Sequence, residues 1–204
     1  MKVKKFRIRP RLGIVARILR SMMSVRQLPQ DLEESIPKEA DDFLPHVVPV
    51  AFYQTWSKDD IPLHYREVLS QAGWEKAVAI SALVATIGPS AEEYLSELLM
   101  SGETNKALLI TALSEESADL ALNFLFKLLS EDAFADDCDV SNPFPVTDSA
   151  LLSETLLLTG AEQEGIHLDS VSHLTPRFTR VALVGWIPIS KKKRLVPVQK
   201  KKSS

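Results

Sequence analysis

The sequence predicts an α+β fold, with a mixed or antiparallel twisted sheet packed by several helices. Helical and strand-like segments are interspersed without regular βαβ alternation, and 45% of the 204 residues are hydrophobic, which suits a packed core. One domain is expected over residues 12–190. It lies between a basic N-terminal arm, residues 1–11, and a basic disordered tail, residues 191–204. We expect the chain to be mobile before about Lys5 and after Ser190.

The first part of the chain predicts three helices and one strand. Residues 12–22 carry apolar side chains at the spacing of one helix face. Residues 29–44 form a second helical stretch, which Pro37 should kink or divide because proline removes a helix hydrogen bond. Residues 46–56 are rich in β-branched and aromatic side chains and predict a strand, placed at an edge by Pro49. A short helix over 63–73 follows and should end at its glycine.

The most apolar strand spans residues 75–88 and is therefore predicted to be central. It ends at a Gly-Pro pair, where a helix begins at once. Glycine-rich turns before helices often hold phosphates, but this turn has one glycine, and Pro89 lacks an amide donor. A structural corner is the favoured interpretation, with Ser90 and Glu93 forming a capping box.

The second half of the chain is predominantly helical. We expect one helix to about residue 100 and a long one from 104 to about 130, buried on several sides because apolar residues nearly encircle it. The acidic, proline-containing residues 131–148 predict a loop. A helix around 150–161 and strands around 165–171 and 179–189 complete the chain.

Charge and composition exclude several classes of function. The net charge of −3 conceals nine basic and no acidic residues in 1–26 and seven basic residues in 191–202. We favour solvated ends over nucleic-acid arms, because no aromatic residues interleave the tail lysines. No apolar run approaches the ~20 residues that cross a bilayer, so we expect a cytoplasmic protein without a membrane partner. Cys138 is alone beside three aspartates, and the four histidines lack a ligand spacing, so neither a nucleophile nor a metal site is expected.

The order of segments resembles a known family. In turn come "VARILRSM", an acidic helix, "VVPVAFYQTW", a short helix, "AVAISALVATIGPSAEEYLSELLMSGETNKALLITAL" and "GIHLDSVSHLTPRFTRVALVG". This order, from about Leu12 to Gly185, resembles the reactivation domain of cobalamin-dependent methionine synthase and its small stand-alone relatives. The best marker is "ATIGP" followed by a helix, a Ser-Gly turn and "ALLITAL".

The resemblance implies where a ligand site would lie. Such domains bind S-adenosylmethionine, which methylates reduced cobalamin on a partner module, and their hallmark is an Arg-x-x-x-Gly-Tyr segment after the long helix. Aspartate, proline and phenylalanine stand at these three positions here, and a second segment, Pro-x-Lys-Ser, is matched by "PRFT". The implied cofactor-binding positions are Asp139, Ser141, Pro143, Phe144, Pro176, Arg177 and Thr179.

These departures predict a degenerate relative that keeps the scaffold and has lost the usual ligand chemistry. An arginine would pair with the ligand's carboxylate, which Asp139 would repel. We therefore expect an accessory to a corrinoid protein or methyltransferase, not an autonomous enzyme. No cofactor would be bound tightly, and cobalamin would be met only through the partner.

Two alternatives remain open. In one, S-adenosylmethionine or a related small molecule binds through a remodelled loop, with Arg177 or Arg180 supplying the missing cation. In the other, the chain is an interaction protein whose basic ends bind nucleic acid or an acidic partner, with steeply salt-dependent affinity.

Overall fold

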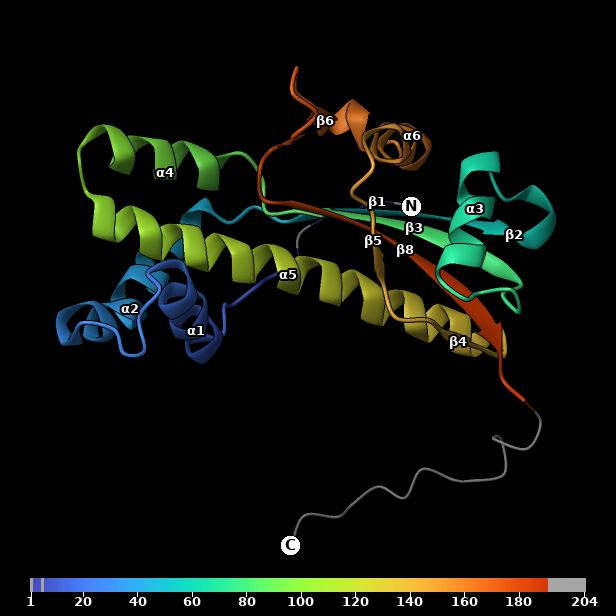
Figure 1. Ribbon diagram of the computed structural model, residues 1–204, viewed down its shortest axis with the longest axis horizontal. Coiled ribbons are helices and arrows are strands. Elements are labelled where there is room, and N and C mark those ends of the chain that lie inside the picture. Colours follow the sequence, from blue (N-terminus) through green and yellow to red (C-terminus); the bar gives the residue numbers. More distant parts are fainter. Residues whose placement is uncertain (1, 5, 191–204) are drawn as a thin grey trace, which may run out of the picture.

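An antiparallel sheet lies between two layers of helices in the computed structural model, which describes residues 2–4 and 6–190 (Figure 1). The tail expected over residues 191–204 lies outside the described residues. The strands are β1 Lys2–Lys4, β2 Val50–Ser57, β3 Ala79–Thr86, β4 Cys138–Val140, β5 Phe144–Pro145, β6 His167–Leu168, β7 Leu174–Thr175 and β8 Thr179–Pro188. The helices are α1 Leu12–Met22, α2 Gln30–Phe43, α3 Leu63–Gln71, α4 Ser90–Met100, α5 Thr104–Ala135 and α6 Ser149–Thr159, with 3-10 turns at Leu44–His46, Lys58–Asp60 and Glu162–Glu164.

The main sheet has the order β1-β2-β3-β8-β4, and every pairing between its strands is antiparallel. β5 also pairs with β8, so β4 and β5 follow one another along the same edge of that strand. β6 and β7 form a separate two-stranded hairpin. The α+β prediction is confirmed.

β3 is the central strand, as its apolar run predicts. Alternate residues point to opposite faces. Leu83 and Ala85 belong to the core formed with α1, α2, α4 and α5, whereas Ala82 and Val84 belong to the core formed with α3 and α6. Burial on both faces explains why this antiparallel strand shows a continuous apolar run rather than alternation.

α5 has 32 residues and a length of about 48 Å, and it runs beneath the sheet (Figure 1). Around Leu113 it is buried on several sides, since α1, α2 and α4 pack there as well. Towards its C-terminus the coverage is partial: Leu125 and Leu129 are fully buried, whereas Phe124 is still exposed although the Phe6 ring stacks on it with ring centres 4.4 Å apart. In contrast to the expectation, burial on several sides is therefore incomplete in this half, and Phe134 near its end is 69% exposed.

The acidic stretch 131–148 is not a loop throughout, which corrects the sequence prediction. Its first five residues extend α5, and Cys138–Val140 and Phe144–Pro145 are strands. β8 offers backbone donors and acceptors along its outer edge, and pairing satisfies both partners. This long-range pairing outweighs the local preference of acidic and proline-containing sequence for a loop.

Three N-terminal expectations are also corrected. Pro37 does not divide α2, because the buried face of this helix packs on the core at a cost of one internal hydrogen bond. β2 begins after Pro49 and is second in the sheet rather than at the edge, since β1 pairs with its first three residues. Residues 2–4, expected to be mobile, form that edge strand.

The Gly-Pro corner between β3 and α4 is built by the backbone. Gly88 has a positive φ of 87°, and a Cβ there would lie 3.0 Å from the carbonyl oxygen of Val48, so glycine is required. Pro89 is the N-cap and has helical angles, which places Ser90 inside the helix. The predicted capping box is therefore wrong: no side chain caps this helix. The first turn instead uses the Pro89 carbonyl, which accepts from the amides of Glu92 and Glu93 at 2.9 and 3.0 Å.

Candidate functional site

The candidate residues are distributed along β8 and do not converge on one pocket. Asp139 on β4 lies opposite Ile187, close to the end of β8, whereas Thr179 is the first residue of that strand. The eight residue steps between Ile187 and Thr179 correspond to about 27 Å of antiparallel strand. The structure therefore separates the Asp139 segment from the Pro176–Thr179 segment.

Between the two ends, the remaining candidates of the first segment have structural contacts. Ser141 joins the edge of β8: its amide donates to the Gly185 carbonyl at 2.9 Å, and its Oγ accepts from the Gly185 amide at 2.9 Å. The Phe144 ring packs edge-on against Trp74, with ring centres 6.2 Å apart. Pro143 is half-buried in the turn between β4 and β5.

A groove opens where β8 begins, and we call it the Arg177 groove. It has a volume of about 700 Å³ and lies between the start of α4, the β5–α6 connection, the β6–β7 hairpin and β8. It combines charged, hydroxyl and apolar side chains. Its lining residues are Glu92, Val146, Thr147, Leu152, Asp169, Ser172, His173, Leu174, Thr175, Arg177, Thr179 and Arg180.

The turn that carries Arg177 is held from inside. Thr179 is buried and its Oγ1 donates to the Pro176 carbonyl at 2.6 Å. The backbone amide of Arg177 donates to the Glu92 carboxylate on α4 at 3.0 Å. Pro176 is buried as well, so only the Arg177 side chain of this segment reaches solvent, with its guanidinium 5.5 Å from the centre of the Phe178 ring.

Arg180 lines the same groove, but its charge is already neutralised. Its Nε donates to the Asp119 carboxylate at 2.7 Å, and its Nη2 contacts the Glu115 carboxylate. Burial opposes the charged form, yet the two carboxylates more than offset it and raise the pKa of Arg180. Recruiting this guanidinium for a ligand would break the ion pairs that join β8 to α5. Arg177 is therefore the cation of the groove that a ligand would meet.

The turn of the β6–β7 hairpin supplies the opposite wall. The Asp169 carboxylate accepts from the backbone amides of His173 and Val171 at 2.8 and 2.9 Å. The hydrogen bond from the His173 amide is the main cause that lowers the pKa of Asp169 from its ordinary value. This wall therefore keeps its negative charge throughout the physiological range of pH.

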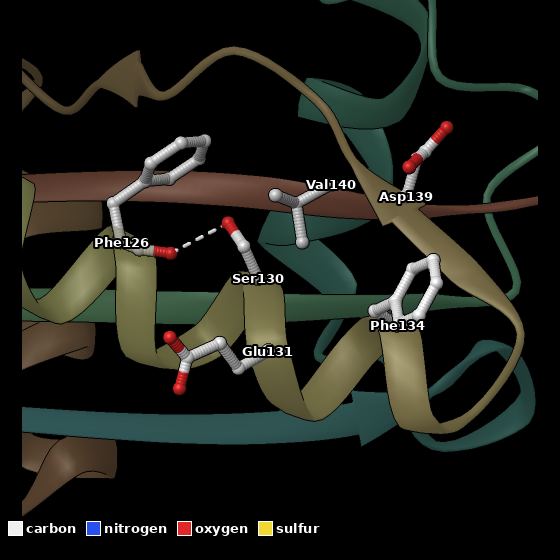
Figure 2. A pocket seen from close by; sticks show the side chains of 6 residues that line it. All are labelled: Phe126, Ser130, Glu131, Phe134, Asp139 and Val140. Carbon is white, nitrogen blue, oxygen red and sulfur yellow. Dashed lines mark hydrogen bonds between the residues drawn. The ribbon is translucent and has the colours of Figure 1, made fainter. Parts of the chain in front are cut away.

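Asp139 lies beside a different groove, between the C-terminal half of α5 and β4 (Figure 2). We call it the α5–β4 groove. It has a volume of about 540 Å³ and is lined by Phe126, Ser130, Glu131, Phe134, Asp139 and Val140. Figure 2 shows the Val140 side chain pointing towards α5 and the Asp139 carboxylate pointing away from it.

The surroundings of Asp139 are negative. The pKa of the Cys138 thiol is raised by burial and by the charges of Asp136 and Asp139. A ligand carboxylate placed here would meet repulsion from the same charges. Within residues 2–4 and 6–190, no group of three or more histidine, cysteine, aspartate or glutamate side chains could hold a metal ion.

Two contacts of the Arg177 groove were not anticipated from the sequence. Glu92 anchors the Arg177 backbone from 85 residues away, and Asp119 holds Arg180 from 61 residues away. The sequence marks Glu92 only as an acid in the first turn of a helix. No local signal relates either acid to its arginine.

Comparison with known proteins identifies the fold and nothing finer. Neither a protein-family model nor a curated protein sequence matches the chain. Among solved structures, it is similar to one described as the MetH reactivation domain bound to AdoHcy, with a TM-score of 0.64 and 12% sequence identity. The match covers 94% of this chain and 79% of the other. The chain has the fold of the MetH reactivation domain.

This similarity supports the resemblance noted in the sequence at the level of architecture. The MetH reactivation domain and this chain share an α+β arrangement over nearly the whole length of the chain. At 12% identity, the similarity does not extend to ligand or partner. Within the described part of the chain, every helix is too short or too polar to cross a membrane.

Proposed function

We propose that this chain is an accessory protein of a corrinoid protein or a corrinoid-dependent methyltransferase, and that it lacks the usual S-adenosylmethionine site. The fold shared with the MetH reactivation domain supports the accessory role. In this proposal the partner holds the cobalamin, and the chain contributes a surface rather than a reaction.

One observation carries the loss of the usual site: Asp139 and Arg177 lie at opposite ends of β8. Asp139 stands where the resemblance would place an arginine, and its neighbourhood is negative. The second segment cannot supply a replacement there from about 27 Å away. A site that needs both segments in contact with one ligand is therefore incomplete.

A second candidate function rests on the Arg177 groove. Among the described residues, no carboxylate pairs with the Arg177 guanidinium, and that group is exposed beside a groove of about 700 Å³. A guanidinium binds carboxylates and phosphates through paired hydrogen bonds. In this alternative, S-adenosylmethionine or another small anionic molecule binds there instead of at Asp139.

Calorimetric titration of the full chain with S-adenosylmethionine and with S-adenosylhomocysteine separates the two functions. The leading proposal expects no saturable heat at micromolar ligand. Arg177→Ala should then change nothing, and Arg66→Ala serves as a matched surface control. Micromolar binding that is lost in Arg177→Ala and kept in Arg66→Ala would overturn the proposed loss of the ligand and establish the second function.

The partner is tested with a purified cobalamin-dependent methionine synthase as a probe. Sedimentation velocity should show the chain moving with the corrinoid protein, detected at the absorbance of bound cobalamin. Bovine serum albumin is a control for non-specific association. Co-sedimentation with the control alone, or with neither protein, would contradict the accessory role.

A further inference from the structure

The α5–β4 groove is an exposed apolar surface within an acidic region. Phe126, Phe134 and Val140 form its apolar part, and 69% of the Phe134 side chain is exposed. Contiguous exposed apolar side chains are typical of a surface that binds another segment. The groove has no role in the ligand chemistry proposed above.

The rim of this groove carries several negative charges. Glu131 on α5 and Asp139 on β4 line it, and Asp136 and Asp137 form the turn between these two elements. Lys127 is the basic residue on the neighbouring turn of α5. Among these described residues, four acids and one lysine give the rim a negative formal charge, and after burial the charges of Asp136 and Asp139 are the causes that raise the pKa of Cys138.

The chain leaves the described structure beside this groove. The Ile189 amide donates to the Asp137 carbonyl at 2.9 Å, so the backbone is still attached to the α5–β4 turn one residue before Ser190. The sequence continues as "KKKRLVPVQKKKSS", in which an apolar LVPV segment lies between two basic clusters. This pattern complements an apolar groove with an acidic rim.

The lengths also agree. From Phe126 to Phe134, the groove spans eight residues of helix, or about 12 Å. Leu195 is five residues beyond Ser190 and can reach up to about 17 Å from it when extended. The apolar segment of the tail can therefore lie along the groove while its lysines meet the rim.

We propose that the α5–β4 groove binds the C-terminal tail of the same chain, residues 191–204. The LVPV segment covers Phe126, Phe134 and Val140, and the flanking lysines pair with Glu131 and Asp139.

A spin label on the tail of the full chain tests this. Gln199→Cys is labelled with a nitroxide, while buried Cys138 should stay unreacted, which labelling of the unmodified chain checks. We expect selective broadening of the Phe134 and Val140 amide signals in the magnetic resonance spectrum. The broadening should fall steeply at 1 M salt, where the screening length is about 3 Å. Broadening spread evenly over the surface would overturn the proposal.

Matched charge reversals show whether the groove is responsible. Glu131→Lys with Asp139→Lys should abolish the selective broadening. Asp31→Lys with Glu97→Lys makes the same change of net charge on exposed residues of α2 and α4 and should preserve it. Equal effects of the two pairs would refute a specific groove.

A mixing experiment separates the tail of the same chain from that of a second copy. Isotope-labelled chain without the nitroxide is mixed with nitroxide-labelled chain that is invisible in the spectrum. We expect no broadening in this mixture. Broadening of Phe134 and Val140 there would show that a second copy occupies the groove, and would overturn binding within one chain.

Discussion

Arg177 and Arg180 are three residues apart, but only the Arg177 guanidinium is accessible to a ligand. Arg180 is half-buried and two carboxylates from α5 neutralise it, whereas the Arg177 guanidinium reaches solvent. Moving the Arg180 guanidinium to a ligand would leave the Glu115 and Asp119 carboxylates without the cation that pairs with both of them. Residue type alone therefore does not identify a binding cation.

At the same scale, Gly185 is needed because it lies beneath an indole ring. A Cβ at this position would be 3.0–3.1 Å from three atoms of the buried Trp74 ring. Gly185→Ala should lower the free energy of unfolding by about 1–3 kcal/mol, because the ring has to shift within a packed core. Urea unfolding followed by circular dichroism measures this.

Gly13 provides the matched control. It lies in α1, and a Cβ there would have no heavy atom within 4 Å. Gly13→Ala should raise the free energy of unfolding by about 0.5–1 kcal/mol, because alanine has less conformational entropy to lose in a helix. Equal effects of the two alanines would contradict the close contact with Trp74.

At the scale of elements, the two halves of α5 differ in how far they are buried. Its first half is enclosed by helices and the sheet, and even Glu116 is buried there, paired through Oε1 with the Nε of Arg11 at 2.6 Å. Its second half has one buried stripe and one exposed side that contributes the α5–β4 groove. Apolar residues on nearly all sides of a helix thus indicate either full burial or an exposed apolar surface that can bind another segment.

Two leucine substitutions test whether only one side of the second half of α5 is buried. Leu125 is fully buried, whereas Leu122 is only half-buried at the margin of the same core. Leu125→Ala should lower the free energy of unfolding by about 2–5 kcal/mol, through lost burial and the cavity that remains. Leu122→Ala should cost clearly less, since solvent already reaches that site. Comparable losses in urea unfolding would show that α5 is buried on both sides.

At the scale of the whole molecule, one sheet is shared by two hydrophobic cores. The larger core includes Trp186 and lies on the side of α1, α2, α4 and α5. The smaller core includes Trp74 and lies on the side of α3 and α6. Unfolding of either helical layer would expose one face of β3 and β8 to water. The two cores should therefore stabilise one another.

We therefore expect a single cooperative unfolding transition. The fluorescence of Trp74 and of Trp186, each measured in a variant with the other two tryptophans replaced by phenylalanine, should report the same urea midpoint. Far-ultraviolet circular dichroism, which follows the helices, should coincide with both. Separate midpoints for the two tryptophans would mean that one layer unfolds alone.

The local sequence determined the elements whose signals lie within a few residues. Residues 12–22 and 149–159 form helices close to their predicted bounds, because the apolar spacing of the first and the Gly160 that ends the second act locally. The apolar run of β3 likewise predicted a central strand. The order of the elements also predicted the α+β class, because strands and helices without βαβ alternation favour it, and the structure then shows which of a mixed or an antiparallel sheet is present.

The tertiary structure alone decided the short strands and the state of the candidate site. β1, β4 and β5 have two or three residues each, too few to be stable by themselves, and they exist because β2 and β8 present edges to them. The separation of Asp139 from Arg177 and the neutralisation of Arg180 depend on which distant segments meet at β8. Such contacts join residues tens of positions apart, so they arise only once the whole chain has packed.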